Sequence, residues 1–377
     1  MIAYVTDIEG RWDKLTTFVA GNPHVSLVDG RLVLAEGVTF VFGGDAIDRG
    51  PDGRRFVRTL LAARHTYGDR VILLAGNRDL NKLRLVHELD ARGARGERLR
   101  WILARTMGAP RAFEHRATEL GTTDDDTVVE SYLADLAAGG DLRAYLDEAR
   151  LAYRAGATLF VHGGITSENF LHVPGEMPAR DLDAWLAALD RFYRGELGRF
   201  AAGGVPTPLI AYQAPVPGTH LNQRSIVYAR PTDEHGNPEL PSADTIAQLR
   251  EYGIERVVVG HTPSGDCPAL VRDAGFELVL ADNSYGRIEE GSHLAFTDDV
   301  TTVGGITQLD DGTRVRVAYA SARHDASPLG LRDRDSGQLV KAALGPRYLL
   351  FRGLADHGVE QLASEVGSRT LVLATPR

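Results

Sequence analysis

The sequence predicts a layered α/β fold, and two observations lead to this prediction. Short apolar runs rich in β-branched residues recur along the chain, and helical patterns lie between several of them. The apolar runs occupy residues 2–7, 38–45, 70–77, 157–164, 256–261 and 276–283. Because their apolar character is continuous rather than alternating, we expect central strands that are covered on both faces. Strands that alternate with helices favour a sheet with helices packed against it.

Two stretches between these runs have the spacing of apolar residues that is typical of helices. They are residues 52–66 and residues 242–252, and Ser242 is a suitable N-cap for the second helix. Each stretch stands just before an apolar run, which fits the alternation of strands and helices.

Two long segments interrupt this alternation. Residues 79–155 carry apolar positions at helical spacing and predict a helical insertion, a cap that could cover a site. Residues 166–241 begin with a helical pattern and then become rich in Pro and Gly, which predicts a helix followed by a long irregular loop. We therefore expect the core over residues 1–78 and 156–300. Short strand-like runs later in the chain predict a β-rich C-terminal extension over residues 301–377.

The composition is that of an ordinary globular protein, with 43% apolar and 25% charged residues in 377. The chain has 42 Lys and Arg against 51 Asp and Glu, and this net charge of −9 argues against a nucleic-acid surface or an anionic membrane as partner. A single cysteine, Cys267, excludes an intramolecular disulfide and fits a reducing compartment. The sequence shows no secretion signal or membrane-spanning run, so we expect a cytoplasmic protein. No obligate protein partner can be inferred.

Polar side chains stand at the carboxyl ends of five of the apolar runs. They are Asp7 with Glu9 two positions later, Asp45, Asn77, His162 and His261. In open α/β sheets this edge is where ligands bind. A single histidine at a strand end is more often structural, but five strand ends of this kind together predict a site.

Phosphoryl transfer explains this set of residues. Two divalent ions roughly 3.5–4 Å apart can clamp both oxygens of an in-line displacement and turn a bridging water into hydroxide. Asp45 is the central candidate for a bridging carboxylate. Asp7 and Glu9 would complete the coordination of one ion. The second ion would be bound by Asn77, His162 and His261. Three carboxylates against a formal charge of +4 leave the pocket net positive, ready for a phosphate dianion.

The residues form five motifs in the order of a known family. They read Asp7-Ile-Glu9-Gly10, Gly44-Asp45-Ala-Ile-Asp48-Arg49-Gly50, Gly76-Asn77-Arg78-Asp79, His162-Gly163-Gly164 and Gly260-His261-Thr262. Over about residues 3–290 the sequence resembles the calcineurin-like metallophosphoesterases, nearest the branch of serine/threonine protein phosphatases and bacterial diadenosine-tetraphosphate hydrolases. The resemblance implies a metallophosphoesterase-type β-sandwich flanked by helices.

The resemblance also implies roles for individual residues. The metal ligands would be Asp7, Glu9, Asp45, Asn77, His162 and His261, and the candidate catalytic residues Asp48, Arg49, Arg78 and Asp79. Arg49 would bind the phosphate. The run 281–286 is similar to the family's final loop, which places Tyr285 and Asp282 at the rim of the site.

The sequence departs from the family's motifs at two positions. Glu9 stands where the family has a histidine ligand, which favours Mn²⁺, with Fe or Mg²⁺ as alternatives, over Zn²⁺. Arg78 stands where the family has the histidine that donates a proton to the leaving group, and arginine does not deprotonate in proteins.

Arg78 has two interpretations. It would either clamp the phosphate or neutralise the leaving oxygen, or it would pair with Asp79, Asp48 or a nearby carboxylate and take no part in the chemistry. Loss of a general acid typically costs ~10²–10⁴-fold, so we expect slow or specialised activity, or a proton donor from elsewhere. His172, His220 and His235 are candidates for that donor, although a surface role is the better interpretation of each.

Several other residues have two interpretations. Lys82 and Arg84 would bind phosphate or belong to a solvated helix face. The acidic run 123–127 is expected to be a solvated loop before a helix, and Cys267 a buried residue rather than a nucleophile.

The leading functional hypothesis is a phosphatase with two divalent metal ions. It would hydrolyse a phosphomonoester of a small molecule, such as a nucleotide or phosphorylated metabolite, by attack of metal-bound hydroxide. One alternative is hydrolysis of a phosphoanhydride or phosphodiester, of the dinucleoside polyphosphate type. The other is a catalytically silent protein that binds phosphate or a partner. An aspartyl nucleophile is discounted because DIEGR lacks the D-x-D-x-T/V pattern, and no P-loop motif occurs.

Overall fold

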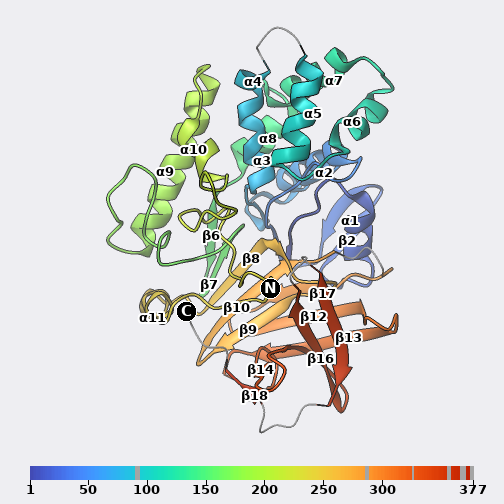
Figure 1. Cartoon of the computed structure of the whole chain (residues 1–377), viewed down its shortest axis with the longest axis vertical. Coiled ribbons are helices and arrows are strands. Elements are labelled where there is room, and N and C mark those ends of the chain that lie inside the picture. The colour runs from blue at the N-terminus through green and yellow to red at the C-terminus, as the bar shows by residue number, and fades with distance from the viewer. Residues whose placement is uncertain (90–93, 285–287, 325–326, 355–357, 366–370, 374–377) are drawn as a thin grey trace.

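Two β-sheets stack face to face at the centre of the molecule (Figure 1). The computed structural model describes residues 1–89, 94–284, 288–324, 327–354, 358–365 and 371–373. The six-stranded sheet has the order β13 (Arg314–Ala322), β12 (Val300–Gln308), β11 (His293–Phe296), β1 (Ile2–Val5), β4 (Thr39–Phe42), β5 (Val71–Leu73). The five-stranded sheet has the order β6 (Ala152–Ala155), β7 (Thr158–Val161), β8 (Arg256–Pro263), β10 (Phe276–Asp282), β9 (Ala269–Asp273). With helices outside both sheets, the predicted layered β-sandwich is confirmed.

Each sheet contains three neighbouring strands that run parallel. In the first sheet these are β1, β4 and β5, and in the second β7, β8 and β10. All six overlap the apolar runs that predict strands. The carboxyl ends of parallel strands meet at the same edge of a sheet, so the residues that follow these strands are brought close together.

The two faces of each sheet explain why the apolar runs show no alternation. Between the sheets, the ring of Tyr4 stacks on that of Phe160 with centroids 5.7 Å apart. On the outer face of the first sheet, Phe42 packs edge-on against Phe56 of α2 (Gly53–Tyr67) at 5.2 Å. Strands buried on both faces need apolar residues at every position.

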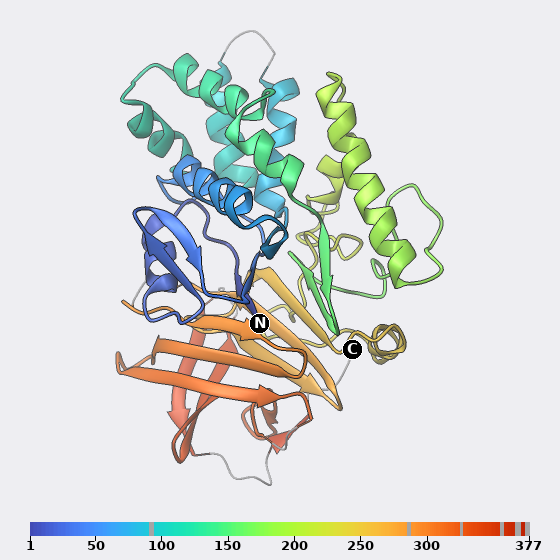
Figure 2. The ribbon, with the colours of Figure 1, turned by 180° about the vertical axis from the view of Figure 1, so that it is seen from behind.

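Most helices lie at one end of the molecule (Figures 1 and 2). After α1 (Trp12–Val19) and α2, the chain forms α3 (Asn77–Asn81), α4 (Leu85–Glu88), α5 (Arg95–Thr106), α6 (Ala112–Leu120), α7 (Asp125–Leu136) and α8 (Asp141–Glu148), with short 3₁₀ turns η1 (Gly68–Arg70) and η2 (Lys82–Arg84). The acidic run 123–127 lies at the start of α7, where Asp124 caps the helix by accepting the N–H of Thr127 at 2.9 Å.

The second long segment forms α9 (Leu182–Ala201) and α10 (Thr207–Tyr212), and then continues without helices to α11 (Ala243–Glu251). Ser242 caps α11 as predicted, because its hydroxyl accepts the N–H of Thr245. Among the described residues, no helix is both long and apolar enough to cross a membrane.

The strands after residue 300 divide between two sheets. β12 and β13 extend the central six-stranded sheet, whereas β17 (Val359–Ser364), β16 (Arg347–Gly353), β15 (Leu339–Leu344), β14 (Arg332–Asp333) and β18 (Leu371–Val372) form a separate sheet in that order. This sheet lies at the opposite end from the helices (Figure 1). β2 (Val25–Val28) and β3 (Arg31–Leu34) form a small hairpin.

A fully buried ion pair joins β8 and β10 of the five-stranded sheet, and a hydrogen bond links it to the other central sheet. Arg256 Nε lies 2.9 Å from Glu277 Oε2, and both side chains are 0% exposed. Arg256 also donates to Thr158 Oγ1, and Thr301 of β12 donates to Glu277. Removal of either charged partner would leave the other buried without compensation.

We expect Glu277→Ala to lower the free energy of unfolding by about 3–5 kcal/mol, because it leaves an uncompensated guanidinium in the interior. Urea titration followed by circular dichroism measures this loss. Glu289→Ala is the control: its pair with Arg314 lies at the surface, so it should leave stability nearly unchanged. Equal effects of the two substitutions would contradict the structural role of the buried pair.

Candidate metal centre

The predicted metal ligands converge at the edge where the parallel strands end. Asp7, Asp45 and Asn77 follow β1, β4 and β5; His162 follows β7, and His261 lies near the end of β8. Two groups of three have ligand atoms that all lie within 4.8 Å of one another. The groups are Asp45, His162 and His261, here called the histidine group, and Asp7, Glu9 and Asp45, here called the acidic group. Asp45 is the member that they share.

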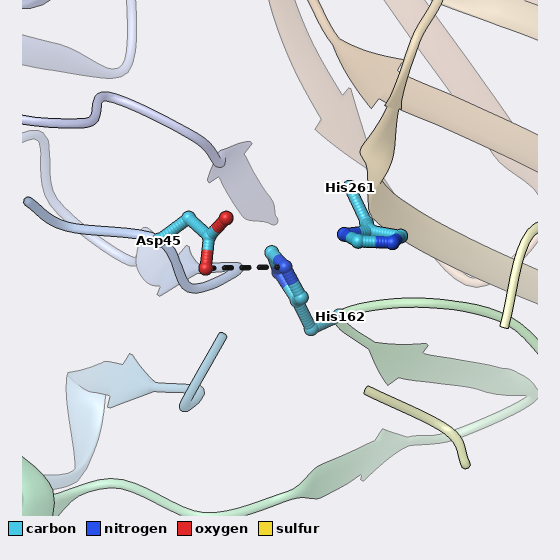
Figure 3. Close-up of side chains that lie close together, drawn as sticks. All are labelled: Asp45, His162 and His261. Carbon is cyan, nitrogen blue, oxygen red and sulfur yellow. Dashed lines mark ion pairs between the residues drawn. The ribbon is translucent and has the colours of Figure 1, made fainter. Parts of the chain in front are cut away.

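The histidine group is drawn in Figure 3, with Asp45 facing His162 and with His261 beside it. His162 Nε2 lies 3.3 Å from Asp45 Oδ1 and 3.1 Å from Asn77 Oδ1. The other ring nitrogen, Nδ1, lies 2.8 Å from the carbonyl oxygen of Gly43, which fixes the ring's orientation. Asn77, predicted as a ligand, therefore lies beside this group.

Four of the six predicted ligands have a left-handed backbone. The φ angles are +53° at Asp7, +54° at Glu9, +59° at Asp45 and +60° at His261. Non-glycine residues seldom adopt this conformation, and such strain is concentrated at functional sites. Backbone hydrogen bonds join the turn after β1 to the turn after β4. The N–H groups of Asp7 and Glu9 donate at 2.9 Å to the carbonyls of Gly44 and Asp45.

Two further contacts require the backbone to approach closely at this edge. A Cβ at Gly76 would lie 2.1 Å from Asp45 Oδ1, so only glycine fits before Asn77. The carboxylate of Asp7 accepts the N–H of His261 at 3.0 Å, which ties the ends of the two sheets together.

Asp79 positions Asp45 and is fully buried. Its carboxylate accepts the backbone N–H groups of Asp45, Ala46 and Gly76, each at 2.9 Å. Burial, together with the charge of Asp45, raises the pKa of Asp79 to about 7. Asp79 thus holds the turns that present Asp45 and Asn77.

Lys82 and Asp48 form a closed pair. Their side chains are 0% and 1% exposed, and Lys82 Nζ lies 2.5 Å from Asp48 Oδ2. Lys82 also donates to the carbonyl of Arg78 at 3.1 Å. Arg84 pairs with Glu88 on its own helical segment.

The two departures from the family's motifs meet in space. Arg78 Nε lies 2.8 Å from Glu9 Oε1 and 3.2 Å from Asp45 Oδ2. The guanidinium also donates to the carbonyl of Met107, next to the end of α5. Arg49 Nε reaches the same oxygen of Glu9 at 3.3 Å, from a half-exposed position.

The buried charges shift one another's ionisation. Burial opposes the charged form of Asp45, but His162 and Arg78 hold its pKa below the usual range. Burial likewise disfavours a charged His162, yet Asp45 and Asp7 raise its pKa to about 10. Burial, with the charges of Arg230 and His162, lowers the pKa of His261 well below its usual value.

Sequence reasoning missed three side chains of this site. The ring of Tyr228 lies over that of His261 with centroids 5.0 Å apart. Arg230 is half-buried, and burial lowers its pKa although the nearby charges of Asp282 and Asp7 oppose this effect. Lys14 Nζ donates to the carbonyl of Asp7 at 2.5 Å and pairs with Asp282 at 3.4 Å.

The segment that carries Tyr228 and Arg230 packs on the His-Gly-Gly motif. Gly163 donates its N–H to the carbonyl of Ile226 at 2.7 Å, and a Cβ at Gly163 would lie 2.7 Å from the carbonyl carbon of Val227. The Pro/Gly loop was predicted to be irregular, but nothing in its composition indicated this contact.

The remaining candidates lie in other environments. His172 is exposed and hydrogen bonds to the carbonyl of Phe170, His235 is exposed beside Glu234, and His220 is exposed. Cys267 is buried. Tyr285 lies outside the described residues.

Comparison with known proteins agrees with this arrangement. A cold-active protein-tyrosine phosphatase of a psychrophilic Shewanella species is 19% identical, with a TM-score of 0.50 over 84% of this chain and 79% of that chain. A serine/threonine phosphatase from Saccharomyces cerevisiae with similarity to human PP5 is 13% identical, with a TM-score of 0.36 over 86% of this chain and 81% of that one. The first likeness supports the fold; the second is too weak to support an argument. No curated protein matches the chain.

The sequence model of the calcineurin-like phosphoesterases matches residues 1–265. That range contains all five motifs and every predicted metal ligand. The chain therefore belongs to the calcineurin-like phosphoesterase family and is a metal-dependent phosphoric ester hydrolase.

Proposed function

We propose that the protein hydrolyses phosphomonoesters of small molecules with the help of two divalent ions, preferably Mn²⁺. The observation that supports this proposal most strongly is the shared position of Asp45 between the histidine group and the acidic group. A cytoplasmic location remains part of the proposal.

The donors fit such ions. His261 Nε2 is buried and has no hydrogen-bond partner among the described residues, and a cation at the histidine group would satisfy it. The carboxylates of the acidic group are hard oxygen donors, which suit Mn²⁺, Mg²⁺ or Fe. When bound, divalent ions supply charge stabilisation at the phosphoryl oxygens and lower the pKa of a coordinated water.

The chain's own cations would orient the phosphate. Arg230 has no ion-pair or hydrogen-bond partner in the described part of the chain, and burial lowers its pKa, so an anion beside it would relieve an unpaired charge. Arg49 and Arg78 reach the centre by their ion pairs with Glu9.

The leaving group would have to depart without a proton from Arg78. Burial opposes the charge of Arg78, but Glu9 and Asp45 raise its pKa above an already high value. Arg78 can therefore stabilise negative charge on the leaving oxygen but cannot protonate it. This supports esters with acidic leaving groups, and phosphoanhydrides of the dinucleoside polyphosphate type are the second candidate.

A small substrate is supported by the loop that carries Tyr228 and Arg230, because these side chains lie against the metal centre. The alternative of a catalytically silent binding protein is set aside, because the chain belongs to a family of metal-dependent phosphoric ester hydrolases.

Metal-stripped protein should release phosphate from p-nitrophenyl phosphate only after addition of Mn²⁺. We expect Asp45→Asn and His261→Asn to lower kcat at least ~10²-fold, as loss of transition-state charge stabilisation does elsewhere. Glu289→Gln, at the surface, is the control. A panel of nucleotides, sugar phosphates, dinucleoside polyphosphates and phosphopeptides then distinguishes the substrate classes. Unchanged turnover in chelated protein would refute the proposal.

Arg230→Ala should raise KM for a phosphomonoester roughly tenfold or more, because it removes a charge-assisted contact to the phosphate. Steady-state kinetics with and without competing inorganic phosphate measure the change. Arg224→Ala is a matched control on the same loop, since the Arg224 side chain is 80% exposed. If both variants behave alike, Arg230 does not bind the phosphate.

Binding of the ion should release a proton. With its pKa raised to about 10, His162 is protonated at neutral pH in the metal-free protein, and an ion must displace that proton to bind the ring nitrogen. Affinity for Mn²⁺ should thus rise with pH, roughly tenfold per unit from about pH 7 to about pH 9. Titration calorimetry in two buffers of different ionisation enthalpy counts the protons; a pH-independent affinity would contradict this assignment.

A further inference from the structure

The two motif departures form one feature of the structure. Glu9 and Arg78, which replace two histidines of the family's motifs, are joined by a 2.8 Å ion pair. Both side chains are only 10% exposed, so water screens this pair little. A neutral histidine at either position could not make the same contact between opposite charges.

The two oxygens of Asp45 face different neighbours. Oδ1 lies 3.3 Å from His162, in the histidine group (Figure 3). Oδ2 lies 3.2 Å from Arg78 Nε, in the acidic group. Only the Oδ2 side of the shared carboxylate therefore faces an arginine, whose charge is permanent.

The acidic group thus carries its own positive charge. Glu9 Oε1 forms ion pairs with both Arg78, at 2.8 Å, and Arg49, at 3.3 Å. A divalent ion at the acidic group would need the same oxygens of Glu9 and Asp45 that Arg78 now contacts. Arg78 cannot lose its charge, so an ion entering this group must either displace the guanidinium or remain beside it at a strong electrostatic cost.

Among the described residues, no lysine or arginine forms an ion pair with Asp45 Oδ1, the oxygen that faces the histidine group. The buried Nε2 of His261 has no partner among the residues that the structure describes. An ion at the acidic group therefore competes with the fixed charge of Arg78, and an ion at the histidine group does not.

We propose that the guanidinium of Arg78 serves as a built-in cation for the acidic group. The chain then holds one divalent ion tightly at the histidine group and admits a second only weakly, in competition with Arg78. This inference rests on the proposed two-ion function and specifies how unequal the two ion sites are.

The competition couples the second ion to the substrate. A phosphate that draws Arg78 away from Glu9 frees the oxygens of the acidic group, so phosphate and the second ion should strengthen each other's binding. Coupling of this kind is reciprocal by thermodynamic necessity.

The test counts ions. Metal-stripped protein is loaded with Mn²⁺, desalted and analysed for metal by mass spectrometry, and Mn²⁺ affinities are measured by calorimetry. Wild type should retain about one ion per chain, with a second affinity at least roughly tenfold weaker, and inorganic phosphate should strengthen that second affinity. Electron paramagnetic resonance separates an isolated Mn²⁺ from a spin-coupled pair.

Arg78→Gln should raise the second affinity at least about tenfold, because the competing charge is gone, and should give the spectrum of a coupled pair. Arg78→Lys keeps the charge and should behave like wild type. Arg49→Gln is the matched control, because Arg49 reaches the same oxygen of Glu9 from a half-exposed position and should matter less. If Arg78→Gln does not fold, Arg78→His, neutral at about pH 8, replaces it.

The outcomes separate the two proposals. Two ions of similar affinity in wild type, or an unchanged second affinity in Arg78→Gln, would overturn the role of Arg78 even if the protein is an active phosphatase. Turnover in metal-stripped protein would overturn the proposed function, whatever the ion count.

Discussion

The carboxylate of Asp45 is the group on which the centre depends. Its backbone is held by Asp79, which accepts the N–H groups of Asp45 and Ala46, and its side chain accepts the N–H of Arg78. The left-handed turn at Asp45 points the carboxylate toward strands of the second sheet. Because Gly76 leaves no room for a Cβ against this carboxylate, the turns after β4 and β5 fit only one arrangement.

Charge balance is the second constraint on the site. Three carboxylates lie within a few ångströms of one another at a buried edge, and such a cluster is unstable without cations. The chain provides Lys14 at the backbone of Asp7 and Arg78 at Glu9 and Asp45. Burial raises the pKa of Asp7 well above its usual value, and nearby Asp282 adds to the effect. The site is built to receive further positive charge.

Much of the fold and part of the site could be predicted from the sequence. The apolar runs marked the parallel strands because burial on both faces demands apolar residues throughout, and the polar residues at their ends had to meet once the strands were parallel. The pair of Glu9 and Arg78 was not foreseen, because which carboxylate an arginine reaches depends on side-chain geometry rather than on spacing. Tyr228 and Arg230 were missed because they lie in a loop without periodicity. Lys82 was an open case that the structure places in a closed pair with Asp48.

The contact between Arg78 and the carbonyl of Met107 has a mechanical consequence. Met107 follows α5, so the same guanidinium joins the metal centre to the end of this helix. Any anion that attracts Arg78 competes with the carbonyl of Met107 for the guanidinium. A ligand that drew Arg78 toward itself would thus be expected to loosen the end of α5, at a distance from the residues that bind the ligand.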